Sequence, residues 1–298
     1  MTSSSTNDAG PHKPEGEPGA RPAGTPAHLA WHGGAVPLDR PRVMGILNVT
    51  PDSFSDGGRF MAREDALASA RKMIAHGVDV IDVGAESTRP DAVPVELDEE
   101  WRRLEPAIGE LVALGAPVSI DTYKAEIAAR ACAAGAVIVN DVWGLQKDPA
   151  MADTVAAAGA AVIMMHNRKG ADPDLDILAD MDRFFERSME LAARAGIPPE
   201  RQMLDPGIGF GKTLDQNYMV INRLDHFARH GLPLLVGASR KRLIGAVLDV
   251  DTDDRLYGSL ALHTIAFVKG AAMVRVHNVQ PHVDAARIAH ATLREHVG

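Results

Sequence analysis

The chain has 298 residues, of which 46% are apolar, so it can bury a sizeable core in one large α/β domain or two ordinary domains. Its formal net charge is −9 and it has no block of basic residues, which argues against a nucleic-acid surface. No apolar run reaches the roughly 18 residues that a membrane helix needs, so no membrane partner is expected. Cys132, the only cysteine, cannot form an internal disulfide, and we expect a soluble protein of the reducing cytoplasm.

Residues 1–28 differ in composition from the rest of the chain. They consist mainly of Ser, Pro, Gly and Ala with scattered charges, and such a segment cannot bury enough surface to offset its ordering entropy. It has neither the basic and apolar regions of a secretory signal nor the acid-poor composition of a transit peptide. We therefore expect a disordered tail at 1–28 and a single domain at 29–298.

Short apolar segments alternate with longer amphipathic segments along this domain. After a possible extra strand within 29–38, the expected strands are 42–47, 78–83, 117–120, 137–139, 161–165, 202–204, 234–236 and 272–276. The expected helices are 63–76, 97–114, 125–134, 149–158, 180–195, 214–230, 255–269 and a last one from about 281. We find no β-hairpin signal, and this alternation is typical of a parallel sheet covered by helices.

Eight strand–helix units of about thirty residues each match a closed (β/α)8 barrel better than an open sheet. The Rossmann alternative requires G-x-G-x-x-G after the first strand, and that motif is missing there. The glycines of Gly207–Gly211 follow the sixth strand and have the wrong spacing. The predicted fold is therefore α/β, a single (β/α)8 (TIM) barrel.

The first core strand runs directly into a long polar loop within Met44–Gly58. From Asn48 onward this stretch has more hydrogen-bonding side chains than a turn requires. Polar segments also follow most of the later strands. Because the carboxyl ends of all strands meet around one mouth in such a barrel, and active sites lie there, we expect these side chains to gather in one site.

One group of strand-end residues suits a flat, nitrogen-rich heterocycle. Asp121, Asn140 and Asp205 each end an apolar strand, where a carboxylate or amide can pair with the N–H groups of a ligand edge. Lys241 adds a donor for a carbonyl or ring nitrogen. Each Asp or Asn alone could be only a helix N-cap, but several meeting at one mouth argue against capping as their sole role.

A second group suits a phosphate ligand. Its members are Asn48, Thr88, Arg89, Arg275 and His277, with Ser239 and Arg240 nearby. Arg is the favoured side chain for bidentate phosphate contacts, and barrels often seat phosphate at the loops after strands seven and eight. Two alternatives stay open: Arg275 could pair with a strand-end carboxylate, and His277 could be a neutral buried histidine.

The spacing of histidines bears on metal binding. No His pair with metal-ligand spacing lies on one element, so a zinc site built by the protein is not expected. A Mg2+ ion held mainly by ligand phosphates and a single oxygen of Asn48 is the expected cofactor.

Several motifs occur in order between residues 42 and 279 and together are highly specific. They are Gly45-Ile-Leu-Asn-Val-Thr-Pro-Asp-Ser-Phe-Ser-Asp-Gly-Gly58, Asp82-Val-Gly-Ala-Glu-Ser-Thr-Arg-Pro90, Ser119-Ile-Asp-Thr122, Asn140-Asp141, Asp205-Pro-Gly-Ile-Gly-Phe-Gly-Lys212, Ser239-Arg-Lys241 and Arg275-Val-His277. On these motifs the sequence resembles the dihydropteroate synthase family of the pterin-binding barrels.

The resemblance implies a transferase that joins 4-aminobenzoate to 6-hydroxymethyl-7,8-dihydropterin diphosphate, acting as a homodimer and a sulfonamide target. The implied pterin-binding residues are Asp121, Asn140, Met165, Asp205, Phe210 and Lys241. The implied diphosphate-binding residues are Thr88, Arg89, Arg275 and His277, with Asn48 as the Mg2+ ligand. The implied 4-aminobenzoate-binding residues are Phe54, Pro90, Ser239 and Arg240. The implied catalytic residues are Asp121, Lys241, Arg275 and His277.

The sequence departs from the family pattern at a few positions and leaves rival functions open. Asn278 follows His277 where the family often has Asp, and Arg242 follows Lys241 where Ser is frequent. Residues 167–169, Asn-Arg-Lys, differ from the Met-x-Gly pattern that is more usual there. A methyltetrahydrofolate:corrinoid methyltransferase would share the ring-binding residues. It would not need the diphosphate clamp, which consists of Thr88, Arg89, Arg275 and His277. A catalytically silent pterin-binding paralogue should have lost part of the clamp or of the first two loops. Schiff-base aldolase chemistry at Lys241 is a remoter alternative.

Overall fold

The structure is a computed structural model that describes residues 24–49, 58–86 and 95–296. Four of the expected site residues, Phe54, Thr88, Arg89 and Pro90, lie outside these ranges, as does most of the expected tail at 1–28. No helix within the described ranges is long and apolar enough to cross a membrane.

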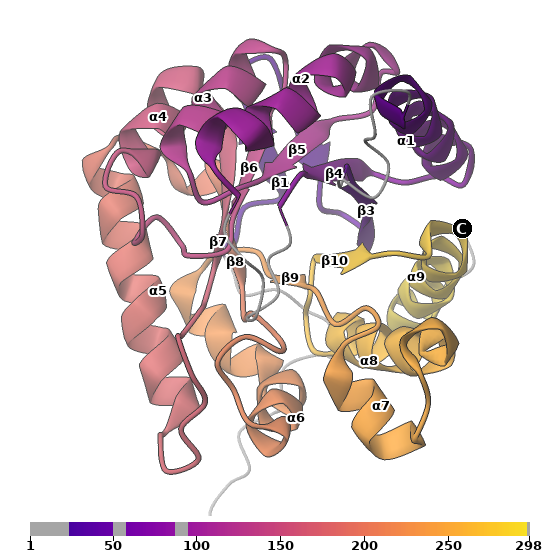
Figure 1. Ribbon diagram of the computed structural model, residues 1–298. Coiled ribbons are helices and arrows are strands. Elements are labelled where there is room, and N and C mark those ends of the chain that lie inside the picture. Colours follow the sequence, from indigo (N-terminus) through magenta and orange to yellow (C-terminus); the bar gives the residue numbers. More distant parts are fainter. Residues whose placement is uncertain (1–23, 50–57, 87–94, 297–298) are drawn as a thin grey trace, which may run out of the picture.

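The described residues form the predicted barrel (Figure 1). Its parallel strands, in sequence order, are β3 (Arg42–Asn48), β4 (Val80–Gly84), β5 (Val118–Asp121), β6 (Ile138–Asp141), β7 (Ala161–Met165), β8 (Gln202–Asp205), β9 (Leu235–Val236) and β10 (Met273–Val276). Their spatial order is β8-β7-β6-β5-β4-β3-β10-β9. A parallel bridge between Leu204 and Leu234 then joins β8 to the start of β9, which closes the sheet on itself.

Helices surround the sheet, and all but α9, which follows the last strand, connect successive strands. They are α1 (Gly58–Ala75), α2 (Leu97–Ala113), α3 (Ala125–Ala133), α4 (Met151–Ala158), α5 (Ile177–Arg194), α6 (Leu214–Asn222), α7 (Arg242–Leu248), α8 (Leu256–Val268) and α9 (Val279–Arg294). Helix α5 begins three residues earlier than expected because Asp176 caps it, accepting a hydrogen bond from the Ala179 N–H at 3.1 Å. The expected helix 214–230 is instead α6 followed by the 3₁₀ helix Leu224–His230.

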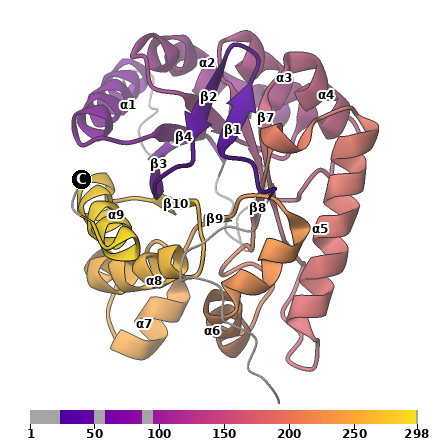
Figure 2. The same cartoon turned by 180° about the vertical axis from the view of Figure 1, so that it is seen from behind.

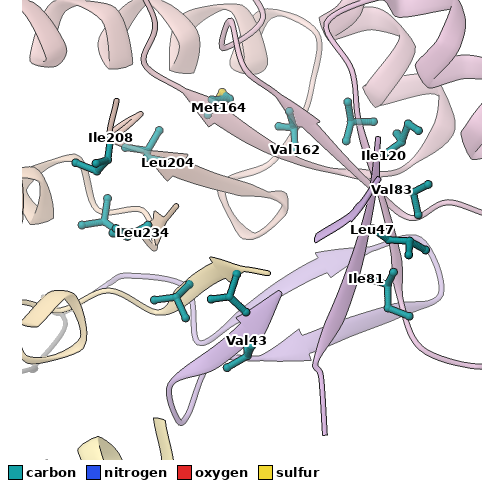
Figure 3. Packing of buried hydrophobic residues seen from close by; sticks show 14 of the residues in the cluster. Val43, Leu47, Ile81, Val83, Ile120, Val162, Met164, Leu204, Ile208 and Leu234 are labelled. Atoms are coloured by element: carbon teal, nitrogen blue, oxygen red, sulfur yellow. The ribbon is translucent and has the colours of Figure 1, made fainter. Parts of the chain in front are cut away.

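The two faces of each strand have different roles because successive side chains point to opposite sides of a sheet. One set of strand residues, including Leu47, Val83 and Val162, packs against the helices in the main hydrophobic core (Figure 3). The other set, including Met44 and Met203, lies in a second cluster inside the barrel. Nearer the carboxyl ends, the inward positions carry polar side chains.

An antiparallel hairpin, β1 (His28–Trp31) and β2 (Gly34–Pro37), precedes the barrel. The expectation of no hairpin was therefore wrong. Its two-residue loop contains Gly33 with φ 91°, a conformation that suits glycine in a tight hairpin turn. Leu29 and Val36 of the hairpin pack into the inner cluster, so the hairpin covers the amino-terminal end of the barrel (Figure 2).

Candidate active site

The carboxyl ends of the strands bring one guanidinium against two carboxylates. Arg275 on β10 donates from Nε to Asp82 Oδ2 at 2.6 Å and from Nη2 to Asp121 Oδ2 at 2.7 Å. The Asn140 amide also donates to Asp82 Oδ2, at 3.1 Å. The alternative left open for Arg275, an ion pair with a strand-end carboxylate, is therefore present, and the ion pair orients the guanidinium.

Burial dominates the electrostatics of these groups. It raises the pKa of Asp121 to about 7, reinforced by Asp82 and opposed by the Arg275 charge. It likewise raises the pKa of Asp205 to about 6, although the Gly207 N–H donates to its carboxylate. Burial alone would lower the pKa of Arg275, but the neighbouring carboxylates more than offset this and the pKa is raised. Arg275 therefore stays charged.

Three buried oxygens at the bottom of the site have no hydrogen-bond partner among the described residues. They are Asp82 Oδ1, Asp121 Oδ1 and Asn140 Oδ1. Buried acceptors in folded proteins are nearly always paired, with protein or with a bound molecule. Their grouping at the strand ends indicates a site that is completed by a ligand or water with N–H or O–H donors.

A pocket opens beside this cluster. Its lining residues are Asn140, Val142, Met165, Asp205, Gly207, Ile208, Phe210, Gly237, Lys241 and Arg275. The Lys241 ammonium lies 4.2 Å from the centroid of the Phe210 ring, so a cation and an aromatic face share one wall. Carboxylate, amide and ammonium groups on apolar walls suit a flat, polar-edged ligand.

The loop after β8 supplies three of the lining residues, Gly207, Ile208 and Phe210, and is held by a buried ammonium. Lys212 Nζ donates to the carbonyl oxygens of Gly207 at 2.9 Å and Phe210 at 3.1 Å, and lies 2.8 Å from His166 Nδ1. Gly207 has φ 63°, and a Cβ there would lie 2.0 Å from the His166 carbonyl oxygen, so no larger residue fits. The loop therefore depends on a glycine and a lysine together.

Lys212 and His166 have perturbed pKa values that agree with this arrangement. Burial lowers the pKa of Lys212 to about 7 and that of His166 to about 2. His166 is therefore neutral, with Nδ1 accepting from the ammonium and Nε2 facing Asp180 Oδ2 at 3.3 Å. A chain of polar contacts thus runs from α5 to the pocket loop.

The second predicted group lies partly apart from the pocket. His277 Nδ1 is 3.0 Å from Ser239 Oγ, and His277 is exposed, so the alternative of a buried histidine was wrong. Arg240 donates from Nε and Nη2 to Asn278 Oδ1 at 3.2 and 3.0 Å, which gives the departure at 278 a structural role. None of the three residues Ser239, Arg240 and His277 lines the pocket.

Asn48 ends β3 with an exposed side chain. A Cβ placed on the neighbouring Gly84 would lie 3.8 Å from Asn48 Oδ1 and 3.6 Å from Asp121 Oδ2, so both oxygens flank the same point. No group of three or more His, Cys, Asp or Glu side chains among the described residues could hold a metal. An amide oxygen near a carboxylate fits a Mg2+ ion that takes most of its ligands from a substrate and water.

Lys124 connects the two flanks of residues 87–94. Its ammonium contacts Glu86 Oε2 at 2.6 Å on one flank and the Val95 carbonyl oxygen on the other. It also binds buried Glu100 on α2, at 2.5 Å. Glu86 and Val95 are thereby both tied to the ammonium of Lys124.

Reasoning from sequence missed two residues of the site. Asp82 lies within β4 rather than at its end, and the detectable signal was a carboxylate in the middle of a buried strand. Lys212 is buried in a loop where a solvated lysine is the usual case. By contrast, the structure brings together Asp121, Asn140, Asp205, Lys241 and Arg275 as predicted.

Comparisons with known proteins agree with this geometry. Residues 44–277 match the family described as pterin binding enzyme. The dihydropteroate synthase of Bacillus subtilis is 44% identical over 254 residues, which are 85% of this chain and 89% of the relative. A solved dihydropteroate synthase of Clostridium difficile, determined with pteroic acid, superposes with a TM-score of 0.82 at 46% identity, covering 85% of this chain and 97% of that one. One of Xanthomonas albilineans with 4-aminobenzoic acid gives 0.85 at 42% identity, covering 90% and 98%. The chain belongs to the dihydropteroate synthase family of pterin-binding enzymes.

Proposed function

We propose that this protein is a dihydropteroate synthase, which joins 4-aminobenzoate to 6-hydroxymethyl-7,8-dihydropterin diphosphate and releases pyrophosphate. The observation that carries the proposal is the pocket itself, where Asn140, Asp205 and Lys241 converge beside the charged Arg275. Two members of the family have been solved with pteroic acid and with 4-aminobenzoic acid, which are related to the product and to one substrate. The proposal explains why a pocket for a flat ring adjoins a cationic group.

The pocket residues would hold the pterin by its polar edge. A pterin presents an amino group and ring N–H groups, which pair with a carboxylate and an amide oxygen such as Asp205 and Asn140. Lys241 would donate to the ring carbonyl or a ring nitrogen. Phe210 and Met165 would pack against the faces of the ring.

The reaction breaks the bond between the substrate methylene carbon and the diphosphate oxygen, and the electron pair leaves with diphosphate. Positive charge then develops on the methylene and spreads into the pterin ring. Asp121, where ionised, would favour that charge electrostatically, and its effect is strong because it is buried. The lone pair of the 4-aminobenzoate nitrogen forms the new C–N bond, and the nitrogen then loses a proton to solvent. An arylamine is neutral at physiological pH, so no general base is required.

The departing diphosphate needs cationic partners. The ion pairs of Arg275 use Nε and Nη2, and the guanidinium has two further N–H donors on Nη1. Arg275 and His277 would bind the anion, with Thr88 and Arg89 as further expected contacts. Asn48 would hold Mg2+, which when bound supplies positive charge to the diphosphate oxygens.

The test is pyrophosphate release from the purified protein with Mg2+, dihydropterin diphosphate and 4-aminobenzoate, omitting each in turn. Release that requires 4-aminobenzoate, with dihydropteroate appearing at the same rate, is the expected result. Tight binding of the pterin diphosphate without release would contradict the proposal and identify a silent paralogue.

We also propose a homodimer whose interface lies on α6, α7 and α8. Large apolar side chains are exposed on these helices, including Met219, Val247 (67% exposed), Tyr257 (80% exposed) and Ile265. Apolar side chains gathered on adjoining helices are typical of a surface that binds another protein. A cytoplasmic location and binding of sulfonamides in place of 4-aminobenzoate belong to the same proposal.

A further inference from the structure

The turn between β9 and α7 contains a residue in an unusual backbone conformation. Lys241 N donates to the Ala238 carbonyl oxygen at 3.4 Å, and Arg240, the third residue of this turn, has φ 56°. Glycine or asparagine is usual at such a position because a Cβ is strained there. A turn with arginine at this point persists only when its surroundings hold it.

One face of α8 provides these surroundings. Arg255 Nη1 donates to the Arg240 carbonyl oxygen at 3.1 Å, and Ser259 Oγ accepts from the Arg240 N–H at 2.9 Å. His263 Nε2 accepts from the Ala238 N–H at 3.0 Å. The three side chains are spaced four residues apart, so they lie on the same side of the helix and contact three backbone groups of one turn.

The hydrogen-bonding states of the three side chains suit these contacts. Ser259 Oγ donates its own proton to the Arg255 carbonyl oxygen at 2.7 Å, which leaves its lone pairs for the Arg240 N–H. His263 accepts at Nε2 only when that nitrogen is unprotonated. Burial lowers the pKa of His263 well below its usual value, and the neighbouring His282 and His277 lower it further.

The turn determines where its side chains lie. Ser239 faces His277, with Oγ 3.0 Å from Nδ1, and Lys241 reaches the Phe210 ring on the pocket wall. If Arg240 left the left-handed conformation, Ser239 and Lys241 would rotate relative to each other. The phosphate side and the ring side of the site would then lose their common geometry.

We propose that Arg255, Ser259 and His263 are positioning residues for the reaction, holding the Ala238–Lys241 turn in its strained conformation without touching either substrate. The inference rests on the proposed function, because its effect is measured as turnover.

The experiment compares Ser259→Ala with Thr264→Ala, a hydroxyl on the same helix that makes no hydrogen bond to the turn within the described residues. Both changes are made in the wild-type chain and in an Arg240→Gly chain, because glycine adopts φ 56° without strain. We expect Ser259→Ala to lower kcat/KM roughly tenfold in the wild-type chain, since the part-buried Arg240 N–H loses its acceptor. In the Arg240→Gly chain we expect less than about twofold further loss, because the turn then keeps its shape without help. Thr264→Ala should stay within twofold of its parent in both.

Equal losses from Ser259→Ala in the two chains would overturn the inference, and so would an unchanged kcat/KM in the wild-type chain. If Ser259→Ala does not fold, His263→Gln and His263→Leu replace it. Gln retains an acceptor and should keep at least about fivefold more activity than Leu, while equal activities would overturn the inference. A wild-type chain without turnover that depends on 4-aminobenzoate would instead contradict the proposed function.

Discussion

The guanidinium of Arg275 binds Asp121 on β5 at 2.7 Å and at the same time binds Asp82 on β4 at 2.6 Å. Both carboxylates are almost fully buried, so one cation serves two acids in a site of low polarity. A buried acid that loses its charge partner is costly to keep ionised. Arg275 therefore controls the charge that Asp121 presents to a bound ring.

Replacing Asp121 with Asn should lower kcat/KM about 100-fold, because the electrostatic stabilisation of a developing cation is lost. The change keeps the size of the side chain, so the melting temperature should fall by only a few degrees. Steady-state kinetics and thermal unfolding of the same preparation measure both effects.

Asp141 provides the matched control. It also lies at a strand end, but its carboxylate accepts from the N–H groups of Trp143 at 2.8 Å and Leu145 at 2.7 Å. Asp141→Asn should therefore reduce stability more than turnover. If the Asp121 change reduced stability and rate in equal proportion, its role would be structural.

The pH dependence of stability follows from the raised pKa of Asp121. In the folded chain this pKa is about 7, against an ordinary value of 3.8, so between these values the folded state binds more protons than the unfolded state. The contribution of Asp121 to the unfolding free energy is full below pH 4 and is lost as the pH rises through 7. His166, with its pKa lowered to about 2, acts in the opposite direction over an overlapping range.

The experiment therefore measures the unfolding free energy of Asp121→Asn and of the parent by urea unfolding, at pH 5 and at pH 7.5. The quantity that matters is the difference between the two proteins at each pH. Relative to the parent, the variant should gain about 1 kcal/mol or more over this interval, since one pKa unit corresponds to about 1.4 kcal/mol. A difference that stays constant with pH would show that the pKa of Asp121 is not raised.

Replacing Lys212 with Met should lower the unfolding free energy by about 1–3 kcal/mol, because two carbonyl oxygens of the pocket loop lose their donor. The KM for the pterin diphosphate should rise as the loop loses its shape. Lys169→Met, at an exposed position nearby, is the control and should leave both quantities unchanged. Equal stability of the Lys212 variant and the parent would mean that burying the ammonium costs as much as its hydrogen bonds contribute.

Removing divalent metal with EDTA should reduce turnover, and adding Mg2+ should restore it. Asn48→Ala should raise the Mg2+ concentration needed for half-maximal rate roughly tenfold, because one oxygen ligand is lost while the substrate supplies the others. Titration of Mg2+ into both proteins decides this. Identical titration curves would remove Asn48 from the metal site.

Introducing Glu at Val247 and Tyr257 should convert a dimer into a monomer, because two charges would be buried in an apolar interface. Sedimentation velocity measures the change directly. Ile288→Glu on α9, an equally exposed apolar position (70%) outside the proposed interface, is the control. A parent chain that sediments as a monomer would contradict the proposed interface.

The barrel could be predicted from sequence because each of its strands is buried on both faces and reads as a short apolar run. Two elements could not. The second strand of the hairpin is Gly34-Ala-Val-Pro37, whose glycine and proline are poor strand formers, and α7 is a seven-residue helix directly after Lys241 in what reads as a loop. In both cases tertiary packing, rather than local periodicity, determines the structure.

The same limit applies to the site. Asp121, Asn140 and Asp205 were detectable because each interrupts an apolar run at its end. The ion pairs of Arg275 depend on the register between β10, β3, β4 and β5, which no local pattern reports. The turn at Arg240 could not be predicted because arginine gives no local signal for a positive φ.

Among the described residues, the inner apolar cluster and the hairpin packed on it fill the amino-terminal end of the barrel, beneath the site. A molecule seated among the strand ends has no exit beneath it, so it can leave only through the mouth by which it entered. Whatever binds above it must then depart first. The fold therefore sets an order of binding, in which the ligand that lies deepest binds first and is released last.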